Sequence, residues 1–185
     1  MVSNLDCINQ GALIVESGDT VVYKLNEELF MESGVDKKLI SAEDDLRNYV
    51  WQLGKKPQGD ILILGLGLGF NVKYILSLPK IKSVTVVEPN INIVTCQQQC
   101  LQSNFNGNRN VNIVCGGFFK YMYEVKDRFD FVFIDCYRQM DGTTWPLVAD
   151  LVTAATHVCK VNGKVAGWVD DSASEYWLNV FKTLF

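Results

Sequence analysis

Short runs of large apolar residues alternate with longer amphipathic segments over the last two thirds of the chain. The most apolar run, Ile61–Leu64, holds four consecutive aliphatic side chains, which predicts a strand buried on both faces. Four further runs predict strands at 83–88, 111–115, 130–135 and 163–169. Around these strands, apolar residues recur at helical spacing. The predicted helices cover residues 71–78, 89–101, 118–125, 145–158 and 173–184.

Strands that alternate with helices are typical of a parallel α/β sheet. Right-handed crossovers then favour a Rossmann-like, doubly wound sheet with strand order 3-2-1-4-5 and helices on both faces. In this order Ile61–Leu64 is central and the strand at 163–169 lies at an edge. Natural proteins usually cover such an edge. Because the last helix is also rich in apolar residues, we expect a homodimer that buries this region.

The first part of the chain predicts a small antiparallel β-meander, with strands at 11–16, 20–25 and 29–31. A meander of this size is too small to form an independent core. A helix is expected from Ser41 to Leu53, since Ser41 with Asp44 forms an N-terminal capping pair. We therefore divide the chain into a meander, residues 1–35, and a Rossmann-like domain, residues 36–185.

Three alternate glycines, Gly65, Gly67 and Gly69, follow the central strand and precede a helix. Glycine tolerates a positive φ and lets the backbone pass close to a ligand. The helix that follows directs its N-terminal amides and the positive end of its dipole toward the same place. A strand, a tight glycine turn and a helix therefore predict a nucleotide-type site.

The spacing of the glycines in this turn narrows the range of possible ligands. A dinucleotide fingerprint places its third glycine at the sixth position, where this chain has Phe70. The next strand ends in Glu88, 19 positions after Gly69, where a carboxylate can accept hydrogen bonds from a ribose diol. This arrangement fits an S-adenosylmethionine site better than a nicotinamide site.

Composition excludes several classes of protein. The 185 residues suit one domain, with 48% apolar and 21% charged residues. A net charge of −4 argues against a nucleic-acid partner, and no apolar run reaches the length of a membrane span, about 18 residues. The N-terminus lacks the pattern of a secretory signal. Six scattered cysteines without a C-x-x-C pair, and a single histidine, predict reduced thiols in a cytoplasmic protein without a metal site.

Four segments together resemble the motifs of class I S-adenosylmethionine-dependent methyltransferases, in the same order and spacing. They are Leu62–Gly69, Val86–Glu88, Val114–Phe119 and Phe129–Asp135. Within this superfamily the chain is most similar to the spermidine-synthase-like branch, which has an aliphatic residue, here Ile63, two places before the first glycine. Members of that branch also carry an N-terminal β-meander. The resemblance covers roughly residues 11–175.

The resemblance implies a cofactor, S-adenosylmethionine or its decarboxylated form. It implies that the glycines line the methionine moiety, that Glu88 holds the ribose hydroxyls and that Asp135 faces the reacting centre. The implied cofactor-binding residues are Gly65, Gly67, Gly69, Phe70, Glu88, Pro89, Gly117 and Phe118. Gly117 stands where the family usually has an aspartate that contacts the adenine amine, so that contact is missing.

The chain departs from polyamine synthases at two places. Leu68 replaces an acid of the glycine loop, and Asp44–Tyr49 only loosely matches an acid–acid–Tyr–His pattern. Both departures remove groups that would hold a cationic amine. Only 16 residues follow Val169, so the two further strands that usually complete the methyltransferase fold are not expected in full.

Three functions follow from these residues. The first is a methyltransferase in which Asp135 orients or deprotonates a small acceptor. The second is an aminopropyltransferase, and the third is a non-catalytic module for cofactor binding or interaction. Asp135 could instead be only a strand-end cap, but strand ends beside a glycine loop favour a functional role. Tyr137 and Asp141 are weaker candidates for substrate contacts, and His157 is expected to have a structural or solvent role rather than to act as a general base.

Overall fold

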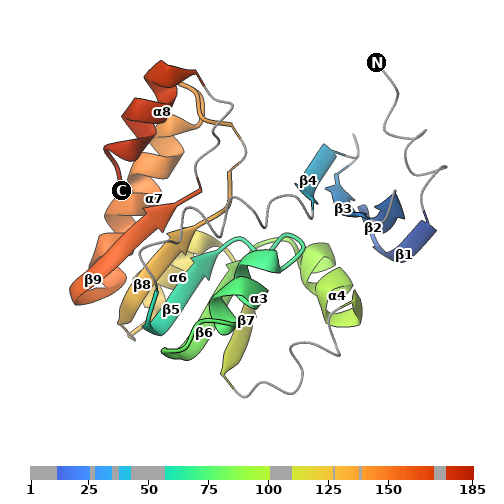
Figure 1. Ribbon diagram of the computed structural model, residues 1–185, viewed down its shortest axis with the longest axis horizontal. Coiled ribbons are helices and arrows are strands. Elements are labelled where there is room, and N and C mark those ends of the chain that lie inside the picture. Colours follow the sequence, from blue (N-terminus) through green and yellow to red (C-terminus); the bar gives the residue numbers. More distant parts are fainter. Residues whose placement is uncertain are drawn as a thin grey trace.

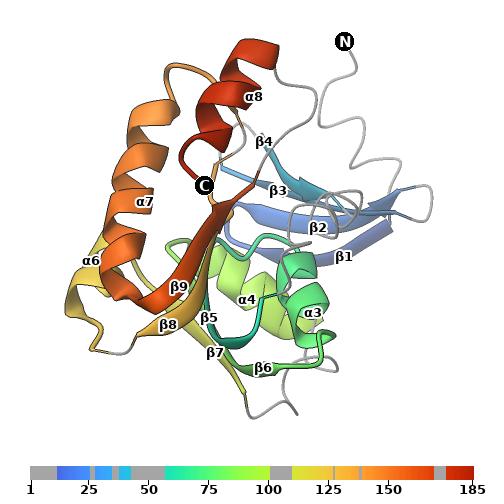
Figure 2. The ribbon, with the colours of Figure 1, turned by 60° about the vertical axis from the view of Figure 1, so that its left-hand side comes forward.

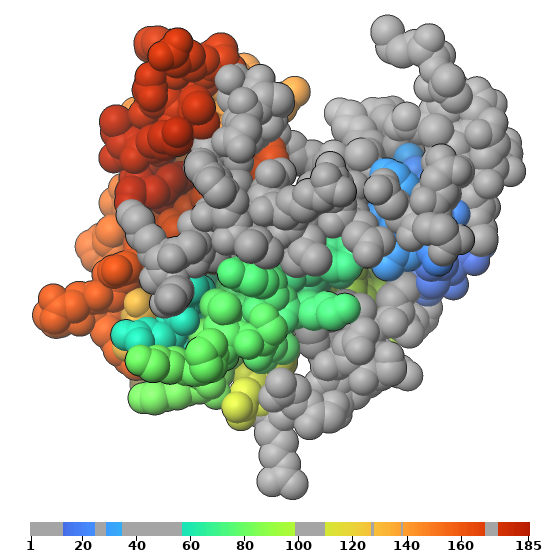
Figure 3. Space-filling view, viewed as in Figure 1, coloured from blue at the N-terminus to red at the C-terminus, as the bar shows by residue number. Residues whose placement is uncertain are grey.

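The computed structural model describes residues 12–25, 28–34, 38–42, 57–100, 110–126, 128–137, 139–168 and 174–185. Within these residues the chain forms a four-stranded antiparallel sheet and a five-stranded parallel sheet (Figure 1). In the space-filling view, the first sheet and the C-terminal helix lie on opposite sides of the molecule, with the green segment that follows β5 between them (Figure 3).

The parallel sheet has the strand order β7-β6-β5-β8-β9, with every pair parallel. Its strands are β5 (Gly59–Leu64), β6 (Ile81–Glu88), β7 (Val111–Cys115), β8 (Phe129–Ile134) and β9 (Cys159–Gly167). This is the predicted order 3-2-1-4-5, and the strand after which the glycine turn follows is the central one. The predicted fold class is therefore confirmed.

Five described helices accompany this sheet, on both of its faces (Figure 2). They are α3 (Phe70–Leu76), α4 (Ile91–Cys100), α6 (Phe118–Glu124), α7 (Trp145–Val158) and α8 (Glu175–Lys182). Alternate side chains of β5 separate the two apolar clusters. Ile61 and Ile63 pack with residues of α3 and α4, whereas Leu62 and Leu64 pack with residues of α6, α7 and α8. All four side chains are fully buried, as the aliphatic run predicts.

β9 begins four residues before its predicted start at Gly163. Cys159 already pairs with Phe129, and the next pair is Phe131 with Lys164, so the intervening residues form an irregularity within the strand. Asn162 has a φ of 68° there. The Asn-Gly pair thus marks an irregularity inside the strand rather than a loop before it.

The antiparallel sheet contains β1 (Ala12–Ser17), β2 (Thr20–Leu25), β3 (Glu28–Ser33) and β4 (Lys38–Ala42), in that order. The helix start predicted at Ser41 is wrong, because Ser41 pairs with Met31 in β4. This pairing is a contact between two separate segments of the chain. The local sequence around Ser41 therefore does not predict it. The remainder of the predicted helix, and Asp44–Tyr49, lie outside the described residues.

The meander shares its core with the parallel sheet. Val22 and Met31 are buried in the same cluster as Ile93 and Cys96 of α4. Polar contacts surround this core: Asn92 Nδ2 donates to Asp19 Oδ1 at 3.0 Å. A meander too small to fold alone is thus stabilised by α4.

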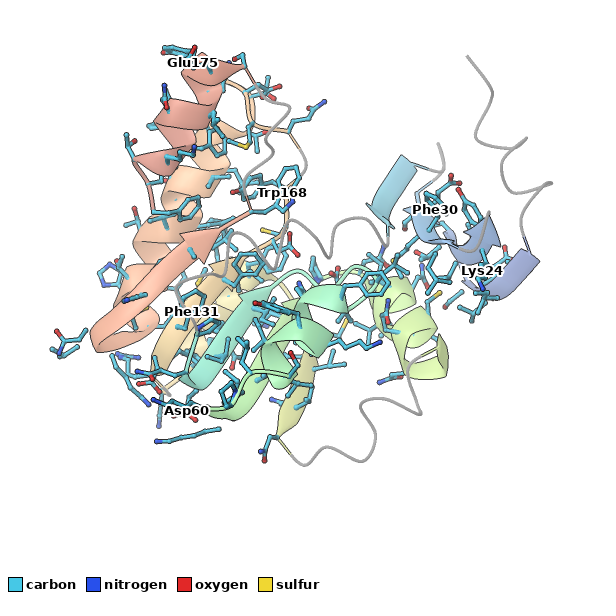
Figure 4. The ribbon with its side chains drawn as sticks, viewed as in Figure 1. Lys24, Phe30, Asp60, Phe131, Trp168 and Glu175 are labelled. Atoms are coloured by element: carbon cyan, nitrogen blue, oxygen red, sulfur yellow. The ribbon has the colours of Figure 1, made fainter. Side chains whose placement is uncertain are left out.

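A cluster of charged side chains joins three strands at the amino ends of the parallel sheet. Lys160 Nζ lies 2.7 Å from Asp60 Oδ2 and 2.8 Å from Asp130 Oδ2. Hydrogen bonds from Lys160 lower the pKa of both carboxyl groups. Asp60 lies at the end of the sheet opposite to Trp168, which follows β9 (Figure 4). This cluster therefore belongs to the framework and lies away from the glycine turn.

The described helices are all too short or too polar to serve as a membrane span.

β9 lies at one edge of the parallel sheet, as predicted. The apolar side chains of α8 contribute less to the case for a dimer than expected, because Phe181 is buried and Trp177 and Val180 pack against the second apolar cluster. Tyr176 is 68% exposed. The homodimer stays a prediction that rests mainly on the edge of β9. Light scattering at micromolar concentration should give twice the mass of one chain, and the mass of a single chain would contradict it.

Candidate functional site

The glycine turn and two predicted site residues lie together at the carboxyl ends of neighbouring strands. The glycine turn follows β5, Glu88 ends β6, and Asp135 directly follows β8. The Leu66 backbone amide donates to Glu88 Oε2 at 3.1 Å, which joins the turn to β6. On the other side, Asn71 Nδ2 donates to Asp135 Oδ2 at 2.8 Å. Ligands of open α/β sheets bind at this edge.

The glycine turn requires glycine for two different reasons. Gly65, Gly67 and Gly69 have φ values of 104°, 49° and 74°, a region that disfavours other residues. At Gly65 the protein itself also excludes a side chain, because a Cβ would lie 2.2 Å from the Asp135 carbonyl oxygen. The sequence-based interpretation assigned the close approach to a ligand. At Gly65 it is made to the backbone at the end of β8.

Glu88 is a buried carboxylate, only 6% exposed. Besides the bond from Leu66, Oε1 accepts the backbone amide of Asn90 at 2.9 Å. Burial raises the pKa of Glu88, and the two backbone donors oppose this rise. Each carboxylate oxygen has two lone pairs, so Glu88 retains the capacity to accept two further hydrogen bonds. That capacity matches a pair of adjacent hydroxyl groups.

Two glycines follow β7. Among the described residues, no atom lies within 4 Å of a Cβ placed at Gly116 or Gly117. Packing against the described part of the structure therefore does not require glycine at either position. Phe118 begins α6 and packs partly against the second apolar cluster.

Two further predicted residues flank the glycine turn and Glu88. Phe70 is half-buried against the first apolar cluster at the start of α3, and Pro89 is exposed directly after β6.

Two buried amide side chains, which the sequence-based interpretation missed, hold the carbonyl groups of the glycine turn. Asn71 and Gln97 are each 1% exposed. Asn71 Nδ2 lies 3.3 Å from the Gly65 carbonyl oxygen, and Gln97 Nε2 lies 2.5 Å from that of Gly67. One signal in the sequence could have identified Gln97. It lies three positions after the buried Val94, which places a polar side chain on the core face of the helix.

Leu68 is 5% exposed and belongs to the first apolar cluster. The position at which polyamine synthases carry an acid is thus part of the core. Asp170 and Asp171, which follow β9 in the sequence, lie outside the described residues.

The two side chains that directly follow Asp135 are uncharged. Burial, and the nearby Asp135 carboxylate, raise the pKa of Cys136 and of Tyr137, so both stay protonated at neutral pH. The Tyr137 hydroxyl donates to the Trp168 carbonyl oxygen, and the two rings meet edge to face. Tyr137 therefore has a structural partner.

Asp141 has a structural partner, and His157 lies away from the site. Asp141 Oδ1 accepts the Thr143 amide at 2.9 Å, just before α7. His157 is exposed in the last turn of α7, at the end of the sheet away from the site. Among the described residues no group of three or more His, Cys, Asp or Glu side chains is placed to hold a metal ion.

No family model and no curated protein matches the chain. Solved structures do match. Spermidine synthase from Thermotoga maritima superposes with a TM-score of 0.68 at 15% identity, over 94% of this chain. The chain has the fold of spermidine synthase and class I methyltransferases. It spans 62% of the length of that spermidine synthase.

Two other solved structures share the methyltransferase fold over a smaller part of the chain. The N-methyltransferase NodS from Bradyrhizobium japonicum, in complex with S-adenosyl-L-homocysteine, gives a TM-score of 0.50 at 12% identity, over 68% of this chain and 59% of its own. Precorrin 8W decarboxylase from Methanobacterium thermoautotrophicum gives 0.51 at 13% identity, over 69% and 62%. At these identities the likeness shows the fold alone.

The buried state of Glu88 predicts a pH dependence of stability. The raised pKa means that the folded protein holds this proton more tightly than the unfolded chain, so ionisation of Glu88 lowers the free energy of unfolding as the pH rises above the usual 4.5. The variant Glu88→Gln cannot ionise. The difference in unfolding free energy, wild type minus variant, should therefore be largest below pH 4.5 and fall as the pH rises.

Urea unfolding of both proteins over a series of pH values measures this difference, because contributions from all other groups largely cancel. A difference that is constant or grows with pH would contradict the assigned burial of Glu88.

Proposed function

We propose that the protein is an S-adenosylmethionine-dependent methyltransferase of the spermidine-synthase-like type that acts on a small acceptor. The observation that carries this proposal is the buried Glu88 carboxylate beside the glycine turn. We further propose that it acts in the cytoplasm, in keeping with the free thiols of its described cysteines Cys96, Cys115, Cys136 and Cys159.

The residues at the strand ends fit the proposed cofactor in three ways. The glycine turn offers backbone without side chains, Glu88 has acceptor capacity for two hydroxyl groups, and no atom of the described residues fills the position of a side chain at Gly117, next to Phe118. When bound, S-adenosylmethionine supplies an electrophilic methyl group. Phe70 and Pro89 flank the turn and Glu88 and complete the proposed binding set.

Asp135 is the residue that we assign to the acceptor. It is half-buried, directly follows β8, and lies against the glycine turn through the contact between its backbone and Gly65. Its carboxylate would orient the acceptor or take its proton. Methyl transfer depends mainly on proximity and alignment, so a single well-placed carboxylate is sufficient for this chemistry.

An aminopropyltransferase is the second candidate. It is favoured by the meander, because the likeness to spermidine synthase extends over 94% of the chain, whereas the two other structures cover 68% and 69%. It is opposed by Leu68, which is buried in the core where a carboxylate would be needed for a polyamine. We therefore rank methyl transfer first. A non-catalytic module remains the third candidate.

Removal of the Glu88 carboxylate should weaken cofactor binding. A hydrogen bond to a charged group is worth about 1.5–3 kcal/mol, and about 1.4 kcal/mol corresponds to a factor of ten. Glu88→Ala should therefore raise the dissociation constant of S-adenosylmethionine at least tenfold in calorimetric titration. The matched control is Glu124→Ala, since Glu124 is exposed at the end of α6.

Titrations with the decarboxylated cofactor and with S-adenosylhomocysteine belong to the same experiment. Tighter binding of the decarboxylated form would favour the aminopropyltransferase. No binding of any of the three by the wild-type protein would reject the proposed cofactor.

Removal of the Asp135 charge should affect turnover. Asp135→Asn keeps the shape of the side chain, and a positioned base typically contributes about 10²–10⁴-fold to the rate. We expect a loss of this size with an identified acceptor, and little change in cofactor affinity. Asp150→Asn is the matched control, because Asp150 is exposed on α7.

Putrescine with the decarboxylated cofactor should give no product. Formation of spermidine would put the aminopropyltransferase first. Tight cofactor binding without turnover of any acceptor would favour the non-catalytic module.

A further inference from the structure

Asn71 connects Asp135 with the glycine turn through one amide group. It is the second residue of α3 and is 1% exposed. Its Nδ2 lies 2.8 Å from Asp135 Oδ2 and 3.3 Å from the Gly65 carbonyl oxygen. The same nitrogen thus contacts the proposed acceptor carboxylate and the proposed cofactor turn.

The orientation of this amide follows from its partners. Asn71 Oδ1 accepts the backbone amide of Val72 at 2.6 Å. On its other side, Asp135 Oδ2 and the Gly65 carbonyl oxygen are both acceptors, so only the NH₂ group can face them. The side chain therefore cannot reverse without the loss of three hydrogen bonds.

The backbone of Asp135 is held independently of Asn71. The Asp135 amide donates to the Leu64 carbonyl oxygen at 2.8 Å, and the Asp135 carbonyl lies against Gly65. These contacts fix where the residue lies but leave the direction and the charge of its carboxylate to side-chain contacts. Asn71 supplies such a contact, and as a neutral donor it leaves the negative charge of Asp135 intact.

We propose that Asn71 is a positioning residue for Asp135, which keeps its carboxylate ionised and in register with the glycine turn. This inference rests on the proposed function for its catalytic meaning. Methyl transfer needs the acceptor at Asp135 aligned with the donor at the turn. One nitrogen of Asn71 contacts both the Asp135 carboxylate and the Gly65 carbonyl oxygen.

The choice of asparagine is chemically specific. A lysine or arginine at this position would neutralise Asp135, and an aspartate would repel it. A leucine of similar volume would fill the space but would leave Asp135 Oδ2 without this donor. The inference therefore makes different predictions for substitutions of nearly equal size.

In the described part of the structure, Asp135 interacts electrostatically with the neighbouring Cys136 and Tyr137, and Glu88 on β6 interacts with Cys136. Cys136 and Tyr137 stay neutral. A hydrogen bond to the ionised form favours that form. Loss of the Asn71 donor should therefore raise the pKa of Asp135.

The test is an NMR titration of protein labelled with carbon-13 at the aspartate carboxyl groups. The Asp135 signal is identified by its absence in Asp135→Asn. In Asn71→Leu its midpoint should rise above the wild-type value. Gln97→Leu is the matched control, because it removes the other buried amide from the turn and has no bond to Asp135. Its Asp135 midpoint should equal that of the wild type.

Asn71→Asp is the second variant, because it preserves the shape of the side chain if Asn71→Leu fails to fold. Two carboxylates at this distance cannot both ionise easily, so the pair should titrate in two separated steps with one midpoint strongly raised. An unchanged Asp135 midpoint in a folded Asn71→Leu or Asn71→Asp protein would overturn the inference.

A kinetic readout separates this inference from the proposed function. With an active enzyme, the acid limb of the pH profile of kcat/KM should move to higher pH in Asn71→Leu. An acid limb that does not move would count against Asn71. Absence of turnover in the wild type would count against the proposed function, and the NMR midpoints would still decide the role of Asn71.

Discussion

The contact between the backbones of Gly65 and Asp135 is the constraint on which the rest of the site depends. These two segments of the chain approach so closely that even one methyl group at Gly65 would collide with the Asp135 carbonyl oxygen. This approach brings the ends of β5 and β8 together, so that Asn71 reaches Asp135 on one side. On the other side, the glycine turn that begins at Gly65 is joined to Glu88 by the hydrogen bond from the Leu66 amide. A packing requirement of the framework thus sets the geometry available for chemistry.

The meander is connected to the same site through Asn90. The backbone amide of Asn90 donates to Glu88 Oε1, and its side-chain Nδ2 donates to Ser33 Oγ of β3 at 3.1 Å. Ser33 in turn lies 2.6 Å from the Thr20 hydroxyl of β2. Hydrogen bonds therefore lead from the antiparallel sheet to the buried carboxylate. The meander therefore helps to hold this carboxylate, in addition to packing against α4.

Local patterns predicted most of the parallel sheet, and contacts between distant segments account for what they missed. The bounds of β7 and α7 agree with the prediction, because apolar runs and clear breakers define them. β4 was missed because its strand character comes from pairing with β3. Asn71 and Gln97 were missed because a polar residue in a helical pattern is usually exposed, and only the folded chain shows what they hold. The placing of Glu88 and Asp135 was predicted, whereas their roles stay proposals.

The packing of the meander against α4 also has a consequence for the order of events during synthesis. The Cys96 thiol meets the Thr20 carbonyl oxygen across 76 residues of chain. At translation rates of about 5–20 residues per second, the meander waits roughly 4–15 s before the helix that covers it has been made. During this interval the apolar side chains of Val22 and Met31, which the finished protein buries, remain accessible to other chains and to chaperones. The first sheet is therefore covered only after β5 and β6, two strands of the second sheet, have been synthesised.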